Sequence, residues 1–161
     1  MNNRSIAPLG AAAIVTALYL AGGGIASADP VSKDEAVAMV QKAVAAIKSE
    51  GAEKAYAEIN NPSGRFVDRD LYIVVYGLDG LVLAHGANAS RVGTNQIGDK
   101  DPDGKAFVKE RVEFAKKQPS FWQSYKFMNP VTKTPSPSKC IASVWTRRRS
   151  AAVFTSKRAG G

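Results

Sequence analysis

Residues 71–76 read LYIVVY, an uncharged run of β-branched and aromatic side chains. Such a run is typical of a strand that is buried on both faces, because a half-exposed strand would alternate polar with apolar residues. The pair Asp79-Gly80 that follows is a hairpin turn signal, and residues 81–85 are the expected returning strand. The sequence therefore predicts a β-hairpin inside a sheet.

A helix is expected before this hairpin. Ser32 followed three residues later by Glu35 is a capping box, which marks the start of a helix. Gly51 ends or bends that helix, and residues 52–59 form a second, shorter one. Apolar residues recur at helical spacing on one face of the first helix: Val37, Val40, Val44 and Ile47.

A further helix and a third strand are expected after the hairpin. Asp101 should cap the helix with Pro102 in its first position, and Pro119 should end it. The strand is residues 121–127 (FWQSYKF). The apolar stripe of this helix consists of Phe107, Val108, Val112, Phe114 and Ala115. The order of helix, strand pair, helix and strand predicts an α+β domain with an antiparallel sheet.

The first 28 residues have the features of an export signal. Arg4 precedes an apolar stretch at residues 11–20 (AAAIVTALYL), and Ala26-Ser27-Ala28 provides a cleavage site. The alternative is an uncleaved anchor, but spanning a membrane takes about 20 apolar residues. We therefore expect cleavage after Ala28, a periplasmic or secreted mature chain, and no stable membrane insertion.

The net charge of +8 is concentrated at the C-terminus. Residues 29–138 carry 15 Lys or Arg against 14 Asp or Glu, whereas residues 139–161 carry six basic residues and no acid. A basic tail can bind polyanions, although an exported chain is not expected to meet nucleic acid. Cys140 is the only cysteine, so no disulfide can form within the chain.

One acidic segment has the spacing of an EF-hand calcium loop, at Asp99, Asp101, Asp103, Gly104 and Glu110. No amphipathic helix precedes it, and Pro102 favours an early helix start. The carboxylates would then offset the dipole at a helix N-terminus, and we expect no metal site.

A search for catalytic residues finds no recognisable set. His85 is the only histidine, so it lacks the second imidazole or thiolate of a zinc site. It also lacks a nucleophile and an orienting group in any recognisable arrangement. We therefore expect a binding protein without a cofactor rather than an enzyme.

Polar and aromatic residues at the strand ends are the candidate ligand contacts. Their polar tips can orient a small molecule in a pocket. Trp122 and Tyr125 differ in strand parity, so they cannot face the same side of a regular strand; we expect Trp122 in the pocket wall and Tyr125 towards the core. The candidates are His85, Asn88, Trp122, Tyr125 and Asn129.

Residues 36–133 resemble the single Cache domain family, type 2. The resemblance rests on LYIVVYGLDGLVLAHGANASRVGTN, then DPDGKAFVKE, then FWQSYKFMNPVTK, in that order. Family members are similar to the periplasmic sensing domains of chemoreceptors and histidine kinases. The resemblance implies a PAS-like, five-stranded antiparallel sheet with a long N-terminal helix. It also implies a pocket for a small metabolite, often a carboxylate, and a membrane-bound sensor protein as partner.

The chain departs from the family pattern after about Thr134. The family would continue with a Pro-Lys-x-x-Tyr strand and a closing Gly-x-Tyr strand, where this chain has SPSKCIASVWTRRRSAAVFTSKRAGG. Reading the codons of this tail from their third base, with suitable synonymous codons, gives EPKQVYCERLDEAAVCGGVYK, which resembles the missing ending. We therefore hypothesise either a frameshift in the gene or a sequencing error near residue 134.

The expected organisation is a signal peptide (1–28), a Cache-type ligand-binding domain (29–138) and a basic tail (139–161), with the last strands of the sheet disrupted. The expected function is small-molecule binding without an attached signalling module. Two alternatives are a secreted protein that binds polyanions through its tail and a nonfunctional, truncated family member.

Overall fold

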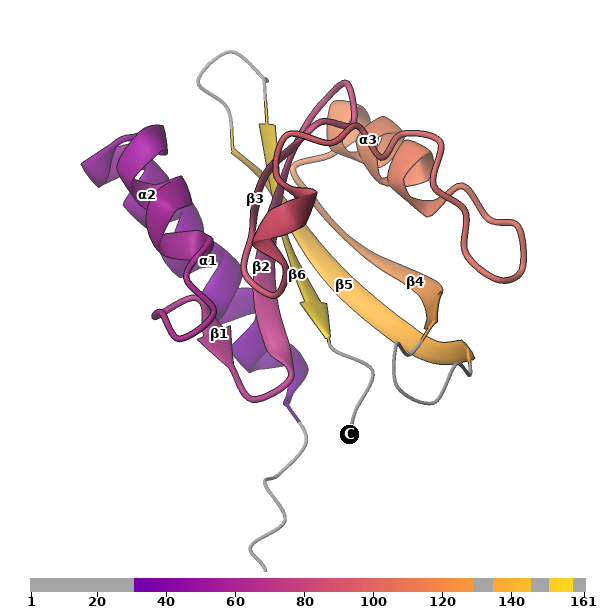
Figure 1. The fold of residues 1–161 in the computed structure, drawn as a ribbon, viewed down its shortest axis with the longest axis horizontal. Helices are drawn as coiled ribbons and strands as arrows, with labels where there is room; N and C mark the ends of the chain where they lie inside the picture. Colours follow the sequence, from indigo (N-terminus) through magenta and orange to yellow (C-terminus); the bar gives the residue numbers. More distant parts are fainter. Residues whose placement is uncertain (1–30, 129–134, 146–150, 158–161) are drawn as a thin grey trace, which may run out of the picture.

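A computed structural model describes residues 31–128, 135–145 and 151–157 (Figure 1). An antiparallel sheet has the two N-terminal helices on one face and a third helix with its preceding connection on the other. The predicted α+β class, with a long N-terminal helix and an antiparallel sheet, is confirmed.

The N-terminal helices begin and end as the sequence predicts. Helix α1 (Lys33–Glu50) starts with the capping box: Ser32 N donates to Glu35 Oε2 at 2.7 Å, and Glu35 N donates to Ser32 Oγ at 3.2 Å. Gly51, at φ 89°, separates α1 from α2 (Ala52–Ile59) because this backbone conformation suits glycine.

The sheet is built around the LYIVVY strand. Strand β2 (Leu71–Gly77) pairs with β1 (Val67–Asp68) and β3 (Val82–His85) along one edge and with β6 (Ala151–Lys157) along the other. Strand β5 (Pro135–Trp145) follows β6, and β4 (Ser120–Met128) ends the sheet. The predicted hairpin joins β2 to β3, with Gly80 at φ 87°.

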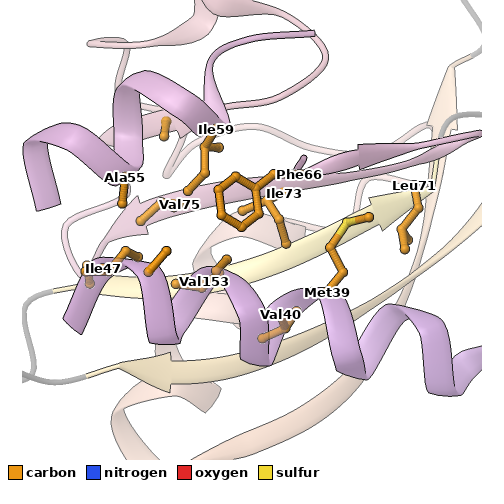
Figure 2. Packing of buried hydrophobic residues seen from close by; sticks show 14 of the residues in the cluster. Met39, Val40, Ile47, Ala55, Ile59, Phe66, Leu71, Ile73, Val75 and Val153 are labelled. Atoms are coloured by element: carbon orange, nitrogen blue, oxygen red, sulfur yellow. The ribbon is translucent and has the colours of Figure 1, made fainter. Parts of the chain in front are cut away.

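The two faces of β2 serve two hydrophobic clusters. Leu71, Ile73 and Val75 pack with α1 and α2, as Figure 2 shows. Tyr72, Val74 and Tyr76 pack on the opposite face with α3 (Phe107–Lys117). Every residue of β2 is buried, which confirms the prediction of a strand without a solvent-exposed face.

The expectation that the last strands are disrupted is wrong in this structure. Strand β6 lies inside the sheet, between β2 and β5, with Phe154 opposite Val74 and Val153 opposite Val75. Residues 151–155 (AAVFT) are buried throughout. A short apolar run cannot be distinguished from a helical segment by periodicity alone, and alanine, present at residues 151 and 152, is depleted in strands, so the sequence did not indicate β6. Residues 139–145 and 151–157 thus belong to strands of the sheet.

The predicted start of the third helix is also wrong. Helix α3 begins at Phe107, not at Pro102. The Asp101 carboxylate accepts hydrogen bonds from the backbone N–H of Asp103 at 3.0 Å and of Lys105 at 2.9 Å, and Gly104 is at φ 82°. Asp101 therefore closes a tight loop instead of capping a helix, since its side chain satisfies local backbone donors in either role.

The capping box predicts a pH dependence of stability. The backbone N–H of Ser32 and the guanidinium of Arg69 lower the pKa of Glu35 from its ordinary value of 4.5 to about 2. A lowered pKa in the folded state means that the charged carboxyl stabilises the fold above its unfolded pKa and loses this effect as the pH falls towards 2. Glu35→Gln should therefore lower the thermal midpoint at neutral pH, and the difference from wild type should shrink on acidification.

Circular dichroism melts across this pH range measure the difference. Asp34→Asn, which removes the same charge from the same helical turn, is the control. If Glu35→Gln lowers the thermal midpoint equally at neutral and at acid pH, the negative charge of Glu35 does not stabilise the fold as described.

The hydroxyl of Thr155 on β6 predicts a stabilising substitution. Thr155 is 1% exposed, and its Oγ1 has no hydrogen-bond partner among the described residues. A buried unsatisfied hydroxyl costs about 1–3 kcal/mol, and valine has nearly the same shape. Thr155→Val should raise the free energy of unfolding by about 1 kcal/mol in urea titrations. Thr94→Val is the matched control, because Thr94 Oγ1 donates to Arg91 O at 2.6 Å. A Thr155→Val midpoint at or below wild type would count against the assignment.

Candidate functional site

A buried arginine is the centre of the candidate site. Arg111 lies on α3 and is only 2% exposed. Its guanidinium carbon lies 4.8 to 5.5 Å from the centroids of four aromatic rings that come from α3, β2, β4 and β6. These rings belong to Tyr76, Phe107, Tyr125 and Phe154. The rings attract the cation through their electron-rich faces, so the sheet and α3 together form an aromatic cage around it.

Gln123 orients the guanidinium of Arg111. Gln123 lies on β4, is 3% exposed, and accepts a hydrogen bond from Arg111 Nε at 3.0 Å. Its Nε2 donates to Phe107 O at 2.9 Å and to Glu110 Oε2 at 2.7 Å. Because both acceptors lie on the nitrogen side, the amide oxygen must face Arg111. The side-chain amide therefore sets the plane of the guanidinium.

A carboxylate and an ammonium group lie behind Gln123. Glu110 Oε2 pairs with Lys105 Nζ at 2.8 Å. Burial raises the pKa of Glu110, but hydrogen bonds from Lys105 and Gln123 and the charges of Lys105 and Arg111 lower it by more. Glu110 is therefore ionised at neutral pH, and Gln123 separates this anion from the caged cation.

Further polar groups belong to the same side of the sheet. Tyr76, one of the cage residues, donates its hydroxyl hydrogen to Gln96 Oε1 at 3.1 Å. Gln96 is itself buried, at 5% exposed, and comes from the connection between β3 and α3. Arg111, Gln123 and the Tyr76–Gln96 pair thus bring charged and neutral hydrogen-bonding groups to a face that is otherwise aromatic.

His85 is tied into the backbone at the end of β3. Its Nδ1 accepts hydrogen bonds from Ala87 N at 3.3 Å and Asn88 N at 3.0 Å, so the proton of a neutral ring is on Nε2. The ring stacks on Tyr72, with centroids 5.2 Å apart, and is 6% exposed. His85 therefore stabilises the turn that follows β3. It lies on the same face of the sheet as α3, and its contact with a ligand stays a prediction.

The other sequence candidates are not gathered at one place. Asn88 is exposed and caps the short helix η1 (Ala89–Arg91), accepting from Ser90 N at 3.1 Å. Trp122 is 45% exposed, and its ring lies under Lys33 Nζ of the α1 side at 5.8 Å. Tyr125 is buried, as expected, and is part of the Arg111 cage. Asn129 lies outside the described residues.

The parity argument for β4 agrees with the structure. Phe121, Gln123 and Tyr125 are buried, whereas Trp122 is exposed, so Trp122 and Tyr125 lie on opposite faces. Trp122 is therefore not beside Arg111 and Tyr125. Whether Trp122 forms part of the wall of a ligand pocket stays a prediction, and any such pocket would lie on the face of β4 opposite the Arg111 cage.

The sequence reasoning missed Arg111, although a signal for it was present. The apolar stripe of α3 includes Phe107 and Val108, and Arg111 follows them at helical spacing of four and three residues. A charged residue within the buried stripe of a helix is rare unless a partner or a function retains it. The spacing of Arg111 therefore indicates a place on the buried face of α3.

The acidic loop uses its carboxylates internally. Asp101 accepts three backbone N–H groups, Asp103 pairs with Lys126 Nζ at 2.8 Å, and Glu110 pairs with Lys105. Over the ranges that the structure describes, no group of three or more potential metal ligands is found. Within the same ranges, no helix is long and apolar enough to span a bilayer.

A hollow on another part of the surface does not coincide with these groups. It is lined by Glu58, Asn61, Gly64 and Arg65, at the end of α2 and in the loop that follows. Arg65 forms ion pairs there with Glu50 and Glu58. The caged arginine, which combines burial, charge and an oriented donor, is the stronger candidate site.

A family model described as single Cache domain 2 matches residues 26–143. The chain belongs to this family. The match extends beyond the resemblance seen in the sequence and into β5. Members are sensory ligand-binding domains and not enzymes.

Solved structures share the Cache fold. A methyl-accepting chemotaxis protein from Vibrio parahaemolyticus has 22% identity and a TM-score of 0.61, covering 78% of this chain and 87% of its own. A structure described as the periplasmic sensor domain of a chemotaxis protein has 20% identity and a TM-score of 0.59, covering 78% and 88%. A Cache chemosensory domain described in terms of carboxylic acid recognition has 18% identity and a TM-score of 0.63, covering 78% and 91%. No curated protein matches the Cache chain.

The contacts of His85 predict a structural effect of its removal. His85→Ala deletes the acceptor for two backbone N–H groups and the ring that stacks on Tyr72. The free energy of unfolding should fall by about 2 kcal/mol, because two part-buried backbone donors lose their acceptor and a buried ring is removed. His85→Asn is the matched variant, since the Asn Oδ1 can replace Nδ1 as acceptor. Urea unfolding of the three proteins measures this, and an Ala variant as stable as wild type would refute the structural role.

Proposed function

We propose that this Cache domain binds a small carboxylate through Arg111. The observation that carries the proposal is a guanidinium 2% exposed, enclosed by four rings and oriented by Gln123. Gln123 fixes the plane of the guanidinium, and the four rings face the cation. A carboxylate is the complementary ligand, because the planar guanidinium fork donates two parallel hydrogen bonds to its two oxygens.

The surroundings of Arg111 favour a short ligand. Gln123 accepts the hydrogen of Nε, and the proposal places the ligand carboxylate at the edge formed by Nη1 and Nη2, where a guanidinium can donate two parallel hydrogen bonds. The rings of Tyr76, Phe107, Tyr125 and Phe154 provide an apolar surface for a small hydrocarbon part. Carboxylic acid recognition by a structurally similar Cache domain supports this ligand class.

The setting of this binding step is part of the proposal. The apolar N-terminal stretch, with its predicted cleavage site after Ala28, supports export, and a structurally similar chain is described as a periplasmic sensor domain. We propose that the domain senses its ligand in the periplasm and passes the signal to a membrane-bound sensor protein. The signal peptide stays a prediction. The same holds for ligand contacts made by His85, Asn88, Trp122 and Asn129.

The alternatives have less support. Lys139 and Lys157 of the basic segment lie on β5 and β6, while Arg147, Arg148 and Arg149 lie outside the described residues, so no observation favours polyanion binding. The alternative of a nonfunctional, truncated family member rests on the departure from the family pattern after Thr134, and the presence of β5 and β6 in the sheet does not favour it. The frameshift near residue 134 stays a hypothesis that sequencing of the gene can test.

Thermal shift and calorimetry with formate, acetate, propionate and pyruvate test the proposal. A bound ligand raises stability by RT ln(1 + [L]/Kd). We expect at least one acid to raise the melting temperature, and its neutral amide, such as acetamide for acetate, to leave it unchanged. A panel in which no acid shifts wild type, or in which amides act like acids, would overturn the assignment.

Arg111→Met is the informative variant, because it retains a long apolar side chain in the cage and removes the charge. It should weaken carboxylate binding at least a hundredfold, since a charge-assisted bidentate pair is lost. Arg91→Met, on η1, is the control for loss of an arginine elsewhere. If Arg111→Met does not fold, the comparison of acids with amides on wild type still decides the outcome.

A further inference from the structure

The outer edge of β4 is held by a loop from another part of the chain. Strand β4 is the last strand in the sheet order, and its described strand partner is β5. In an antiparallel strand, the N–H and C=O of alternate residues point to the same edge. Lys126 N and Ser124 O bond groups outside the sheet, which places both on the edge away from β5.

Two side chains of the loop hold these edge groups. Asp101 Oδ2 accepts from Lys126 N at 3.1 Å, and Lys105 Nζ donates to Ser124 O at 2.8 Å. Asp103 also pairs with Lys126 Nζ at 2.8 Å. One donor and one acceptor of the strand edge are thereby satisfied by side chains in place of a neighbouring strand.

Asp101 links the shape of the loop to the strand edge. Its Oδ1 accepts from Asp103 N and Lys105 N, while Oδ2 accepts from Lys126 N, and the residue is 8% exposed. The same carboxylate therefore closes the loop and docks it onto β4. Burial raises the pKa of Asp101, but the three backbone hydrogen bonds and nearby Lys105 lower it overall, so it is charged at neutral pH.

We propose that the 101–105 loop masks a self-association surface on β4, and that the partner which fits the unmasked edge is a second copy of this chain. Exposed strand edges readily pair with other strands, and proteins cover them to prevent this. Strand β4 extends for nine residues (Ser120–Met128) without proline, which is long enough to act as such a template.

The side chains of β4 favour pairing with itself. A two-fold axis at Ser124 aligns the strands antiparallel, so that Ser124 faces its own counterpart. Trp122 of each copy then faces Lys126 of the other copy, which gives two equivalent pairs on the exposed face of the strand. Cross-strand pairs of an aromatic ring and a cation are favourable. Trp122 is 45% exposed in the single chain, where Lys33 already lies over its ring at 5.8 Å.

The test removes the two loop side chains from the full-length protein. Asp101→Ala combined with Lys105→Met should produce a concentration-dependent dimer in sedimentation velocity, whereas wild type should show no association through this edge. The control is Asp99→Ala combined with Lys100→Met, which also removes one negative and one positive charge, but just before the loop. This variant should behave as wild type. A folded Asp101/Lys105 variant without a dimer would overturn the proposal.

A third substitution shows whether any dimer uses this edge. Adding Trp122→Lys places two lysines opposite each other in the proposed pairing and should raise the dimer dissociation constant at least tenfold. Trp122 is exposed, so the change should be tolerated. A dimer of unchanged affinity would show that association occurs elsewhere and would refute the proposed surface.

Amide hydrogen exchange on wild type keeps the proposal testable if the loop variants do not fold. Lys126 N, though on the outer edge, should exchange slowly because Asp101 accepts its hydrogen. Fast exchange of this amide would mean that the loop does not hold the edge in solution, and the proposal would fail.

Discussion

The burial of both faces of β2 is the constraint on which the rest of the structure depends. All seven residues of Leu71–Gly77 are shielded from water. A strand without a solvent-exposed face must be covered twice and paired at its edges, because unpaired buried backbone groups are costly. Helices α1 and α2 cover one face, α3 and its connection cover the other, and β3 and β6 pair along the two edges.

The two faces of the sheet have different chemistry, and this difference locates the candidate site. The face under α1 and α2 is packed by aliphatic residues and Phe66. The face under α3 includes Arg111, Gln123 and His85 among aromatic rings. Burying a cation is costly unless neighbouring groups compensate. The aromatic cage and the Gln123 amide contribute to that compensation, and the proposed carboxylate ligand would add an opposite charge.

Local signals predicted the elements better than the site. The capping box at Ser32, the break at Gly51 and the Asp79-Gly80 turn are each completed within a few residues, so they could be recognised in the sequence. The position of His85 and Asn88 at the end of a strand indicates candidate ligand contacts, but both residues have local structural roles. Arg111 was overlooked because its importance depends on rings from three strands that are distant in sequence.

The sequence by itself determined the α+β class, the hairpin, the two N-terminal helices and the opposite orientations of Trp122 and Tyr125, because periodicity, capping and turn chemistry act between near neighbours. Only the tertiary structure decided that residues 151–157 lie beside β2, because pairing between strands far apart in the chain is not specified by any local pattern. The same is true of Asp101, whose second oxygen reaches a strand 25 residues away. A carboxylate can satisfy N–H groups in a helix cap, a loop or a strand edge equally well, and the packing of the whole chain determines which of them it meets.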